Sequence, residues 1–145
     1  MQTITVNASR TYQVHVGAGL LARAGELAAP LVRGREAAVV SDSSVWPLYG
    51  QAVTRSLEEA GFHTEHFVFP AGEASKNPQT LLELLTFLAQ RGLTRQDAVF
   101  ALGGGVTGDM AGLAAALYQR GVPCIQLPTS LLSMVAEGRT VSLSI

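Results

Sequence analysis

The stretch that decides the fold is Ala98-Val99-Phe100-Ala101-Leu102-Gly103-Gly104-Gly105-Val106-Thr107-Gly108-Asp109. Its apolar first half predicts a buried strand, and small residues from near Asp109 onward predict a helix. Between them the glycines have the spacing G-x-G-x-x-G. Such a turn lets backbone N–H groups approach a pyrophosphate with no Cβ in the way, and the helix dipole favours the anion. A tight turn with no ligand is the alternative.

Strand-like and helix-like patterns alternate along the rest of the chain. Strands are expected at residues 4–6, 12–16, 36–41, 62–69, 98–102 and 123–127. Helices are expected at residues 19–29, from Ser43 or Ser44 to Gly61, from Asn77-Pro78 to Gly92, and from near Asp109 to Gly121. Leu48, Val53, Leu57 and Ala60 are expected to face inward from the second helix. The alternation predicts an α/β fold, a Rossmann-like and mostly parallel sheet with helices on both faces, in one domain over residues 1–145.

Composition excludes several classes of protein. Of 145 residues, 48% are apolar and 14% charged, with a net charge of -1, so a packed core is expected and nucleic acid is not an expected partner. The start, Met1–Thr5, has no secretory signal pattern. The longest apolar run, Met110–Tyr118, is too short to span a bilayer, so no membrane association is expected. The single cysteine, Cys124, is interpreted as a buried, inert thiol and suits the cytoplasm.

Polar or small residues follow four of the expected strands. They are Asp42, then Gly72-Glu73 with Lys76, then the glycine turn up to Asp109, then Thr129-Ser130. In parallel α/β sheets, ligands bind beyond the carboxyl ends of the strands. The convergence of four such loops on one edge therefore predicts a ligand site there.

Each of these residues also has an alternative interpretation. The dinucleotide fingerprint expects an acid about 20 residues after the glycines, and none lies near Ile125. Asp42 could supply the ribose contact instead, or could serve as a helix cap together with the serines after it. Asp109 could stabilise the first turn of its helix, position a nicotinamide, or do both. Lys76 could place a charge near a phosphate or lie in an ordinary surface loop.

Two further sets of polar residues are less informative. Thr129 and Ser130 could cap a helix or bind a cofactor. His15, His63 and His66 do not share the spacing of metal ligands on one helix face, so they are interpreted as structural or solvated, and no metal site is expected.

Taken together, the loops resemble the 3-dehydroquinate synthase family of sugar phosphate cyclases. Four strings carry the resemblance, in this order: Pro70-x-Gly72-Glu73-x-x-Lys76, Gly103–Gly112, Tyr118-x-Arg120-Gly121 and Pro128-Thr129-Ser130-Leu131-Leu132. They cover about residues 1 to 135 of the chain. The resemblance implies that the chain is the NAD-binding N-terminal half of such an enzyme. A C-terminal, mainly helical domain would bring the ligands for Zn²⁺, one Glu and two His, and is absent from these residues.

The resemblance also implies roles for individual residues. NAD would contact Asp42, Gly72, Glu73, Lys76, Gly104, Gly105, Val106, Gly108, Asp109, Thr129 and Ser130. Lys76 and Arg120 would be catalytic, and Arg120 would reach the substrate phosphate across the interface of a homodimer. The implied reaction of the shikimate pathway, which leads to the aromatic amino acids, converts 3-deoxy-arabino-heptulosonate 7-phosphate to 3-dehydroquinate and phosphate.

The tail departs from the family pattern over residues 136–145. Ala136 stands where the family has an Asp, and Glu137-Gly138-Arg139-Thr140 resembles an altered form of its Gly-Gly-Lys-Thr. We therefore expect this chain alone to be inactive. A related cyclase with another sugar phosphate as substrate, and a nucleotide-binding module without catalysis, are the alternative interpretations.

Overall fold

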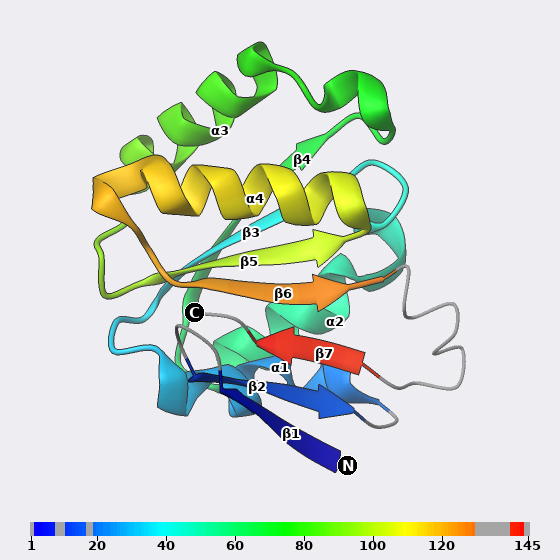
Figure 1. The fold of residues 1–145 in the computed structure, drawn as a ribbon, viewed down its shortest axis with the longest axis vertical. Coiled ribbons are helices and arrows are strands. Elements are labelled where there is room, and N and C mark those ends of the chain that lie inside the picture. The colour runs from blue at the N-terminus through cyan, green and yellow to red at the C-terminus, as the bar shows by residue number, and fades with distance from the viewer. Residues whose placement is uncertain (1, 8–10, 17–18, 130–139, 144–145) are drawn as a thin grey trace.

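The computed structural model describes residues 2–7, 11–16, 19–129 and 140–143, in which strands and helices alternate (Figure 1). The strands are β1 (Gln2–Asn7), β2 (Thr11–Val16), β3 (Glu36–Asp42), β4 (His63–Phe69), β5 (Ala98–Gly103), β6 (Cys124–Pro128) and β7 (Thr140–Leu143). The helices are α1 (Ala24–Ala28), α2 (Trp46–Glu59), α3 (Pro78–Gln90) and α4 (Gly105–Leu117). Short 3-10 turns cover Leu20–Arg23, Ala29–Leu31, Glu73–Ser75 and Tyr118–Arg120.

The described strands form one sheet in the order β1-β2-β7-β6-β5-β3-β4. Strands β4, β3, β5 and β6 run parallel, with β5 in their interior, where Phe100 lies between Val39 and Ile125. Strands β7, β2 and β1 extend the sheet in antiparallel pairing. The prediction of a Rossmann-like sheet is confirmed by the four parallel strands.

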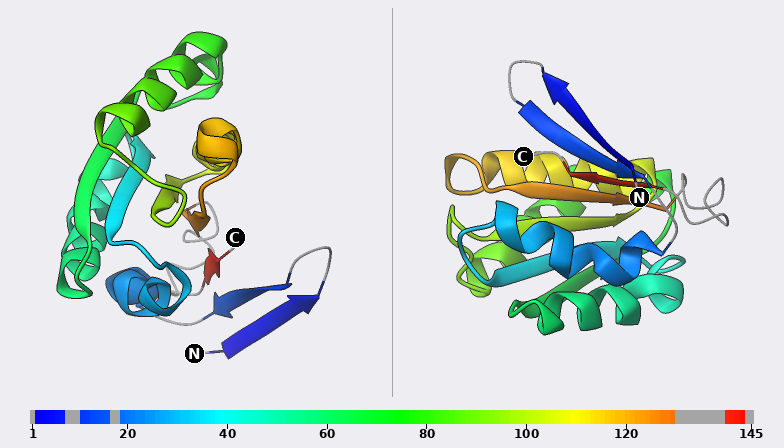
Figure 2. Two further views of the ribbon diagram at one scale, coloured as in Figure 1. Left: turned by 90° about the vertical axis from the view of Figure 1, so that its left-hand side faces the viewer. Right: turned by 90° about the horizontal axis from the view of Figure 1, so that it is seen from below.

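Helices cover both faces of the parallel strands, and each face has its own core (Figure 2). Phe100 and Leu102 of β5 belong to the core beneath α1 and α2. Val99 and Ala101, which alternate with them, belong to the core beneath α3 and α4. Burial on both sides explains why the strand is a continuous apolar run rather than an alternating one.

The helix expected over residues 19–29 is broken into a 3-10 turn, the short α1 and a second 3-10 turn, which contains Pro30. A close approach to α2 fixes α1 in place. The Gly25 N–H donates to Ser56 Oγ at 2.9 Å, and a Cβ on Gly25 would lie 2.1 Å from the Ser56 carbonyl oxygen. Only glycine fits there without a shift of backbone.

The start of α2 corrects two expectations. Neither Ser43 nor Ser44 caps the helix; Asp42 Oδ1 instead accepts from the backbone N–H groups of Ser44 and Val45, both at 2.8 Å. Leu48 was expected in the core but is 71% exposed, because it lies on the solvent side of the first turn. The expectation for Val53 and Leu57 is confirmed, since both are fully buried.

Helix α3 begins as predicted, with Asn77 Oδ1 accepting from the Thr80 N–H at 2.8 Å. Helix α4 begins at Gly105, four positions earlier than expected. Gly104 is its N-cap, and the Gly108 N–H donates to the Gly104 carbonyl at 3.0 Å, which closes the first turn. Asp109 consequently lies in the second turn, so the predicted placement in the first turn is wrong.

Candidate functional site

The glycines between β5 and α4 fall into two classes. A Cβ on Gly103 would lie 2.5 Å from Thr107 Oγ1, and one on Gly108 would lie 2.8 Å from Gln126 Oε1. These two positions are small because neighbouring side chains of the protein occupy the space. Packing within the chain therefore explains why residues 103 and 108 are glycine, and no ligand is needed for that explanation.

The other two glycines have no such neighbour. A Cβ on Gly104 or on Gly105 would meet no atom of the described chain within 4 Å. Gly104 has extended backbone angles that other residues adopt readily, so conformation does not require glycine there. The space in front of these two residues is open toward the carboxyl edge of the sheet.

This open space lies at the N-terminus of α4. No side chain caps the helix at Gly104. The first N–H groups of a helix have no partner within it, and the helix dipole places partial positive charge at the same end. The turn is therefore suited to an anion.

Thr107 is a further residue of this turn that the sequence did not single out. Its side chain is fully buried, and its Oγ1 has no hydrogen-bond partner in the described structure. Its position against Gly103 explains its burial. A threonine among glycines carries no sequence signal that would have revealed this.

Lys76 and Asp109 meet across the space between the loop after β4 and helix α4. Lys76 Nζ lies 2.8 Å from Asp109 Oδ2, and the two side chains are 45% and 61% exposed. The hydrogen bond and charge of Asp109 raise the pKa of Lys76 above its ordinary value, with a smaller contribution from Glu73. The structure thus brings together two of the residues that the sequence predicted for the site.

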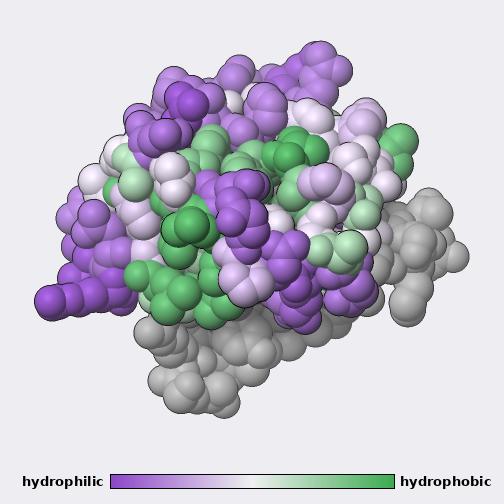
Figure 3. Space-filling model, turned by 90° about the horizontal axis from the view of Figure 1, so that it is seen from above, coloured by the Kyte–Doolittle hydropathy of each residue, from purple (hydrophilic) through white to green (hydrophobic). Residues whose placement is uncertain are grey.

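A hollow of about 360 Å³ adjoins this ion pair, between α3 and α4. Its walls include Leu81, Met110 and Leu113, and Leu113 is 47% exposed. Figure 3 shows hydrophobic side chains exposed among hydrophilic ones on this side of the molecule. Leu81 is partly buried against the core and also borders the hollow.

Asp42 lies at the end of β3 on the same edge of the sheet. Its Oδ1 accepts from two N–H groups of the turn that precedes α2, which fixes the direction of the carboxylate, but the helix itself has no side-chain cap. These bonds occupy one oxygen and leave Oδ2 available to a ligand.

The loop after β4 is held beside Asp42 by specific hydrogen bonds. The Ser43 N–H donates to the Phe69 carbonyl at 2.9 Å, and the Ala71 N–H donates to Ser43 Oγ at 2.9 Å. Gly72 has φ of 114°, a conformation that favours glycine. Glu73 begins the exposed 3-10 turn that leads to Lys76.

The loop after β6 is described only in its first residue. The Thr129 N–H donates to the Gly103 carbonyl at 2.9 Å, which places Thr129 beside the glycine turn. Ser130, predicted for the same site, lies outside the described residues. So do residues 136–139 of the divergent tail.

Arg120 lies apart from these residues. It follows α4 and precedes β6, so it occupies the amino edge of the sheet, opposite to the glycine turn (Figure 1). Within one copy of the chain, the structure does not bring Arg120 together with Lys76.

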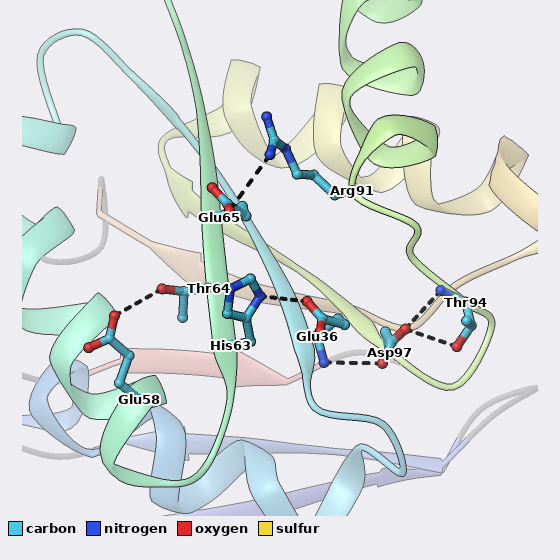
Figure 4. A network of polar contacts seen from close by, with 8 residues as sticks. All are labelled: Glu36, Glu58, His63, Thr64, Glu65, Arg91, Thr94 and Asp97. Atoms are coloured by element: carbon cyan, nitrogen blue, oxygen red, sulfur yellow. Dashed lines mark hydrogen bonds and ion pairs between the residues drawn. The ribbon is translucent and has the colours of Figure 1, made fainter.

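A second polar network lies at the amino ends of β3 and β4 (Figure 4). His63 Nδ1 lies 2.8 Å from Glu36 Oε2, and this contact raises the pKa of His63. His66 instead stacks on Trp46, with ring centroids 4.3 Å apart. No group of three or more His, Cys, Asp or Glu side chains among the described residues could hold a metal ion.

Two remaining properties concern the thiol and the helices. Cys124 is only partly buried, which differs from the prediction of a buried thiol. Desolvation nevertheless raises the pKa of Cys124 to about 12, as expected for an inert thiol. Across the residues placed by the structure, every helix is too short or too polar to cross a membrane.

Comparison with known proteins places the chain in a family. The family model described as "3-dehydroquinate synthase N-terminal" matches residues 66–141 of the chain. A 3-dehydroquinate synthase of Pseudomonas fluorescens is 50% identical over 136 residues, which are 93% of this chain and 36% of that protein. The chain thus spans about a third of the length of the curated relatives it matches.

Solved structures agree with this assignment. A 2-deoxy-scyllo-inosose synthase complexed with carbaglucose-6-phosphate, NAD+ and Co2+ matches with a TM-score of 0.80 and 27% identity, over 88% of this chain and 35% of that one. ValA, a 2-epi-5-epi-valiolone synthase from Streptomyces hygroscopicus with NAD+ and Zn2+ bound, matches with a TM-score of 0.72 and 30% identity, over 91% and 36%. With the sequence match over residues 66–141, these findings show that the chain belongs to the 3-dehydroquinate synthase family, in its N-terminal region.

Proposed function

We propose that the carboxyl edge of the sheet binds NAD, as the cofactor-binding part of a 3-dehydroquinate synthase. The observation that carries the proposal is the open space at Gly104 and Gly105, which neither packing nor backbone conformation explains. A dinucleotide pyrophosphate needs this kind of close approach to backbone N–H groups at a helix N-terminus.

The surrounding residues fit the rest of a dinucleotide. Pyrophosphate oxygens would accept from the N–H groups of Gly105 and Val106 at the start of α4. Asp42 would accept from ribose hydroxyls, because its carboxylate is already oriented by the turn that precedes α2. Lys76 and Asp109 would lie toward the nicotinamide end. Gly72, Glu73, Thr129 and Ser130 complete the proposed contacts, whereas Gly108 acts through packing against Gln126.

The reaction of the whole protein is part of the same proposal. It would convert 3-deoxy-arabino-heptulosonate 7-phosphate to 3-dehydroquinate and phosphate. Bound NAD would supply a reversible hydride acceptor. Relatives carrying this enzyme's name are 44–50% identical to the chain, whereas the two solved cyclases with other names are 27% and 30% identical. The identities therefore favour 3-dehydroquinate synthase over a related cyclase.

The metal expected for such an enzyme does not fit the described residues. They contain no cluster of carboxylates, imidazoles or thiols that could hold it. We therefore assign no metal ligand here and expect the 145-residue chain to release no phosphate from the substrate.

Arg120 supports a homodimer as part of the proposal. Strand β5 has 6 residues, which at about 3.3 Å per residue separate the two edges by about 20 Å. The Arg120 of a second copy could reach the substrate phosphate, whereas the Arg120 of the copy that binds the substrate could not. We place the protein in the cytoplasm, where a chain with a single cysteine needs no disulfide.

Titration of the chain with NAD, followed by saturation-transfer NMR, tests the proposal. We expect weak binding, on the order of millimolar, because one domain supplies only part of the contacts. Gly105→Leu should abolish it, since the new side chain enters a space in which a Cβ meets no described atom within 4 Å. Ala89→Leu places the same side chain at an exposed position of α3 and should leave binding unchanged. Wild-type affinity in Gly105→Leu would refute the site and favour a module that binds elsewhere.

A further inference from the structure

Gln126 of β6 is a polar residue among apolar neighbours. Ile125 and Leu127, on either side of it in the strand, are fully buried in the core beneath α1 and α2. Gln126 faces the other way, toward α4, and is paired in register with Ala101 of β5, which belongs to the core beneath α3 and α4. Strands that are covered on both faces are ordinarily apolar throughout, so packing alone does not explain an amide at this position.

The amide of Gln126 lies against two glycines of α4 that are about one turn apart. Its Nε2 donates to the Gly108 carbonyl at 3.3 Å, and the same nitrogen lies 3.5 Å from Cys124 Sγ. A Cβ on Gly108 would lie 2.8 Å from Gln126 Oε1, and a Cβ on Gly112 would lie 3.7 Å from Nε2. Glycine at residue 108 therefore makes room for the amide, and the amide holds the carbonyl of that same residue.

Gly108 also closes the first turn of α4, which borders the open space at Gly104 and Gly105. The Gly108 N–H donates to the Gly104 carbonyl at 3.0 Å. A carbonyl oxygen has two lone pairs, so the Gly108 carbonyl can accept from Gln126 as well as from within the helix. The contact with Gln126 therefore fastens the first turn of α4 to β6.

The other side of the glycine turn is held by the same strand, through its backbone. Gly103 pairs with Pro128, and the Thr129 N–H donates to the Gly103 carbonyl at 2.9 Å. Strand β6 thus holds the end of β5 by main-chain bonds and the start of α4 by the side chain of Gln126. These two attachments together set the direction of the N–H groups of Gly105 and Val106.

Packing does not force the side chain of Gln126 into this contact. Gln126 is partly exposed and lines a hollow of about 550 Å³ beside α4. Open space therefore adjoins the side chain, and its amide could bind water there instead. Substitutions at residue 126 have room to fit for the same reason.

We propose that Gln126 is a positioning residue for the NAD site. By holding the Gly108 carbonyl, it orients the first turn of α4 so that the N–H groups of Gly105 and Val106 converge on the pyrophosphate. Gln126 acts through the backbone of α4 and not by contact with the cofactor. A hydrogen bond weakens as donor and acceptor lose alignment, so a small rotation of the turn should weaken binding without unfolding the domain. This inference rests on the proposed function, because it concerns the same site.

The test is titration of the chain and its variants with NAD, followed by ¹⁵N NMR of the backbone. Gln126→Leu removes the donor, and we expect about fivefold weaker binding, which is the loss that one neutral hydrogen bond gives. Gln126→Glu keeps the shape of glutamine but presents a carboxylate to the Gly108 carbonyl, so we expect a larger loss, of about tenfold. A role in packing predicts the opposite order, because Glu has the shape of Gln and Leu does not.

Gln90→Leu and Gln90→Glu, at the exposed end of α3, are the matched controls and should bind NAD like the wild type. A second measurement needs no ligand. In the NAD-free chain, the N–H signals of Gly105 and Val106 should shift in both Gln126 variants and stay in place in both Gln90 variants. A contact that only stabilises the fold would lower the free energy of unfolding in urea without moving these two signals.

Each outcome separates this inference from the proposed function. If the wild type binds NAD and Gln126→Leu or Gln126→Glu binds it equally well, the positioning role is overturned and the proposed function stands. An equal loss in the Gln90 variants overturns the positioning role in the same way. A wild-type chain that binds no NAD overturns the proposed function and the role of Gln126 with it. Far-UV circular dichroism shows which variants are folded, and if one is not, the other decides.

Discussion

Lys76 Nζ lies 2.8 Å from Asp109 Oδ2, which joins the loop after β4 to the second turn of α4. Lys76 is the only lysine of the sequence, so isotope-labelled lysine gives one side-chain Nζ signal. We expect that signal to titrate above the ordinary pKa of 10.5. Asp109→Asn should return the pKa toward that value, and high salt should reduce the difference because both groups are exposed. An unchanged pKa in Asp109→Asn would show that the pair does not form in solution.

The His63–Glu36 pair predicts a pH-dependent contribution to stability. The hydrogen bond and charge of Glu36 raise the pKa of His63 above its ordinary value of 6.5. The contribution is therefore fully present below pH 6.5 and lost as the pH rises through the raised pKa. Glu36→Gln should lower the melting temperature at about pH 5.5 and have less effect at about pH 9. A difference that grows with pH would contradict the sign of this linkage; His63→Gln is the control that removes the titrating group.

The left-handed backbone at Gln119 predicts a stabilising substitution. Gln119→Gly relieves a conformation that costs about 1 kcal/mol for a residue with a Cβ, at a position with φ of 52°. Urea denaturation should show a gain approaching that value, reduced by the greater entropy of unfolded glycine. Ala116→Gly, three residues earlier at an exposed position of α4, should instead lose about 1 kcal/mol. Equal losses in both variants would mean that residue 119 is not left-handed.

Two glycines should lose very different amounts of stability on the same substitution. Gly25→Ala places a methyl group 2.1 Å from the Ser56 carbonyl oxygen, so α1 and α2 must separate. We expect a loss of about 1–3 kcal/mol in the free energy of unfolding, as for other overpacked sites. Gly104→Ala meets no atom within 4 Å and should cost less than about 0.5 kcal/mol. Urea denaturation compares the two, and an equal loss would contradict the assignment of open space.

The thiol of Cys124 should resist modification in the native protein. Its pKa is raised to about 12 by burial, so the reactive thiolate is scarce at neutral pH. Reaction with a disulfide reagent should be slow in buffer and fast in urea. Rapid native labelling would show that the junction of β6 and α4 opens readily.

The sequence predicted those features that depend on local periodicity and turn chemistry. The buried β5, the cap of α3 by Asn77 and the parallel order of β-α units follow from apolar runs and from the backbone needs of individual residues. The start of α4 was placed too late because Gly105 and Gly108 are poor helix formers. Tertiary packing overrides that preference, since a Cβ at residue 108 would meet Gln126 of the neighbouring strand.

Other features depended on contacts between distant segments. The hydrogen bond from the Gly34 N–H to the Gln96 carbonyl joins the loops before β3 and β5, which are far apart in the chain. The antiparallel pairing of β7 with β2 likewise has no local signal.

The stack of Trp46 on His66 gives the molecule an intrinsic optical probe. The sequence contains one tryptophan, and its ring lies 4.3 Å from the imidazole at an interplanar angle of 21°. Fluorescence excited selectively from indole therefore comes from Trp46 alone. Trp46 is the first residue of α2 and lies four residues after Asp42 in the sequence. We expect a ligand at the neighbouring edge of the sheet to change this fluorescence, which needs no label and no substitution.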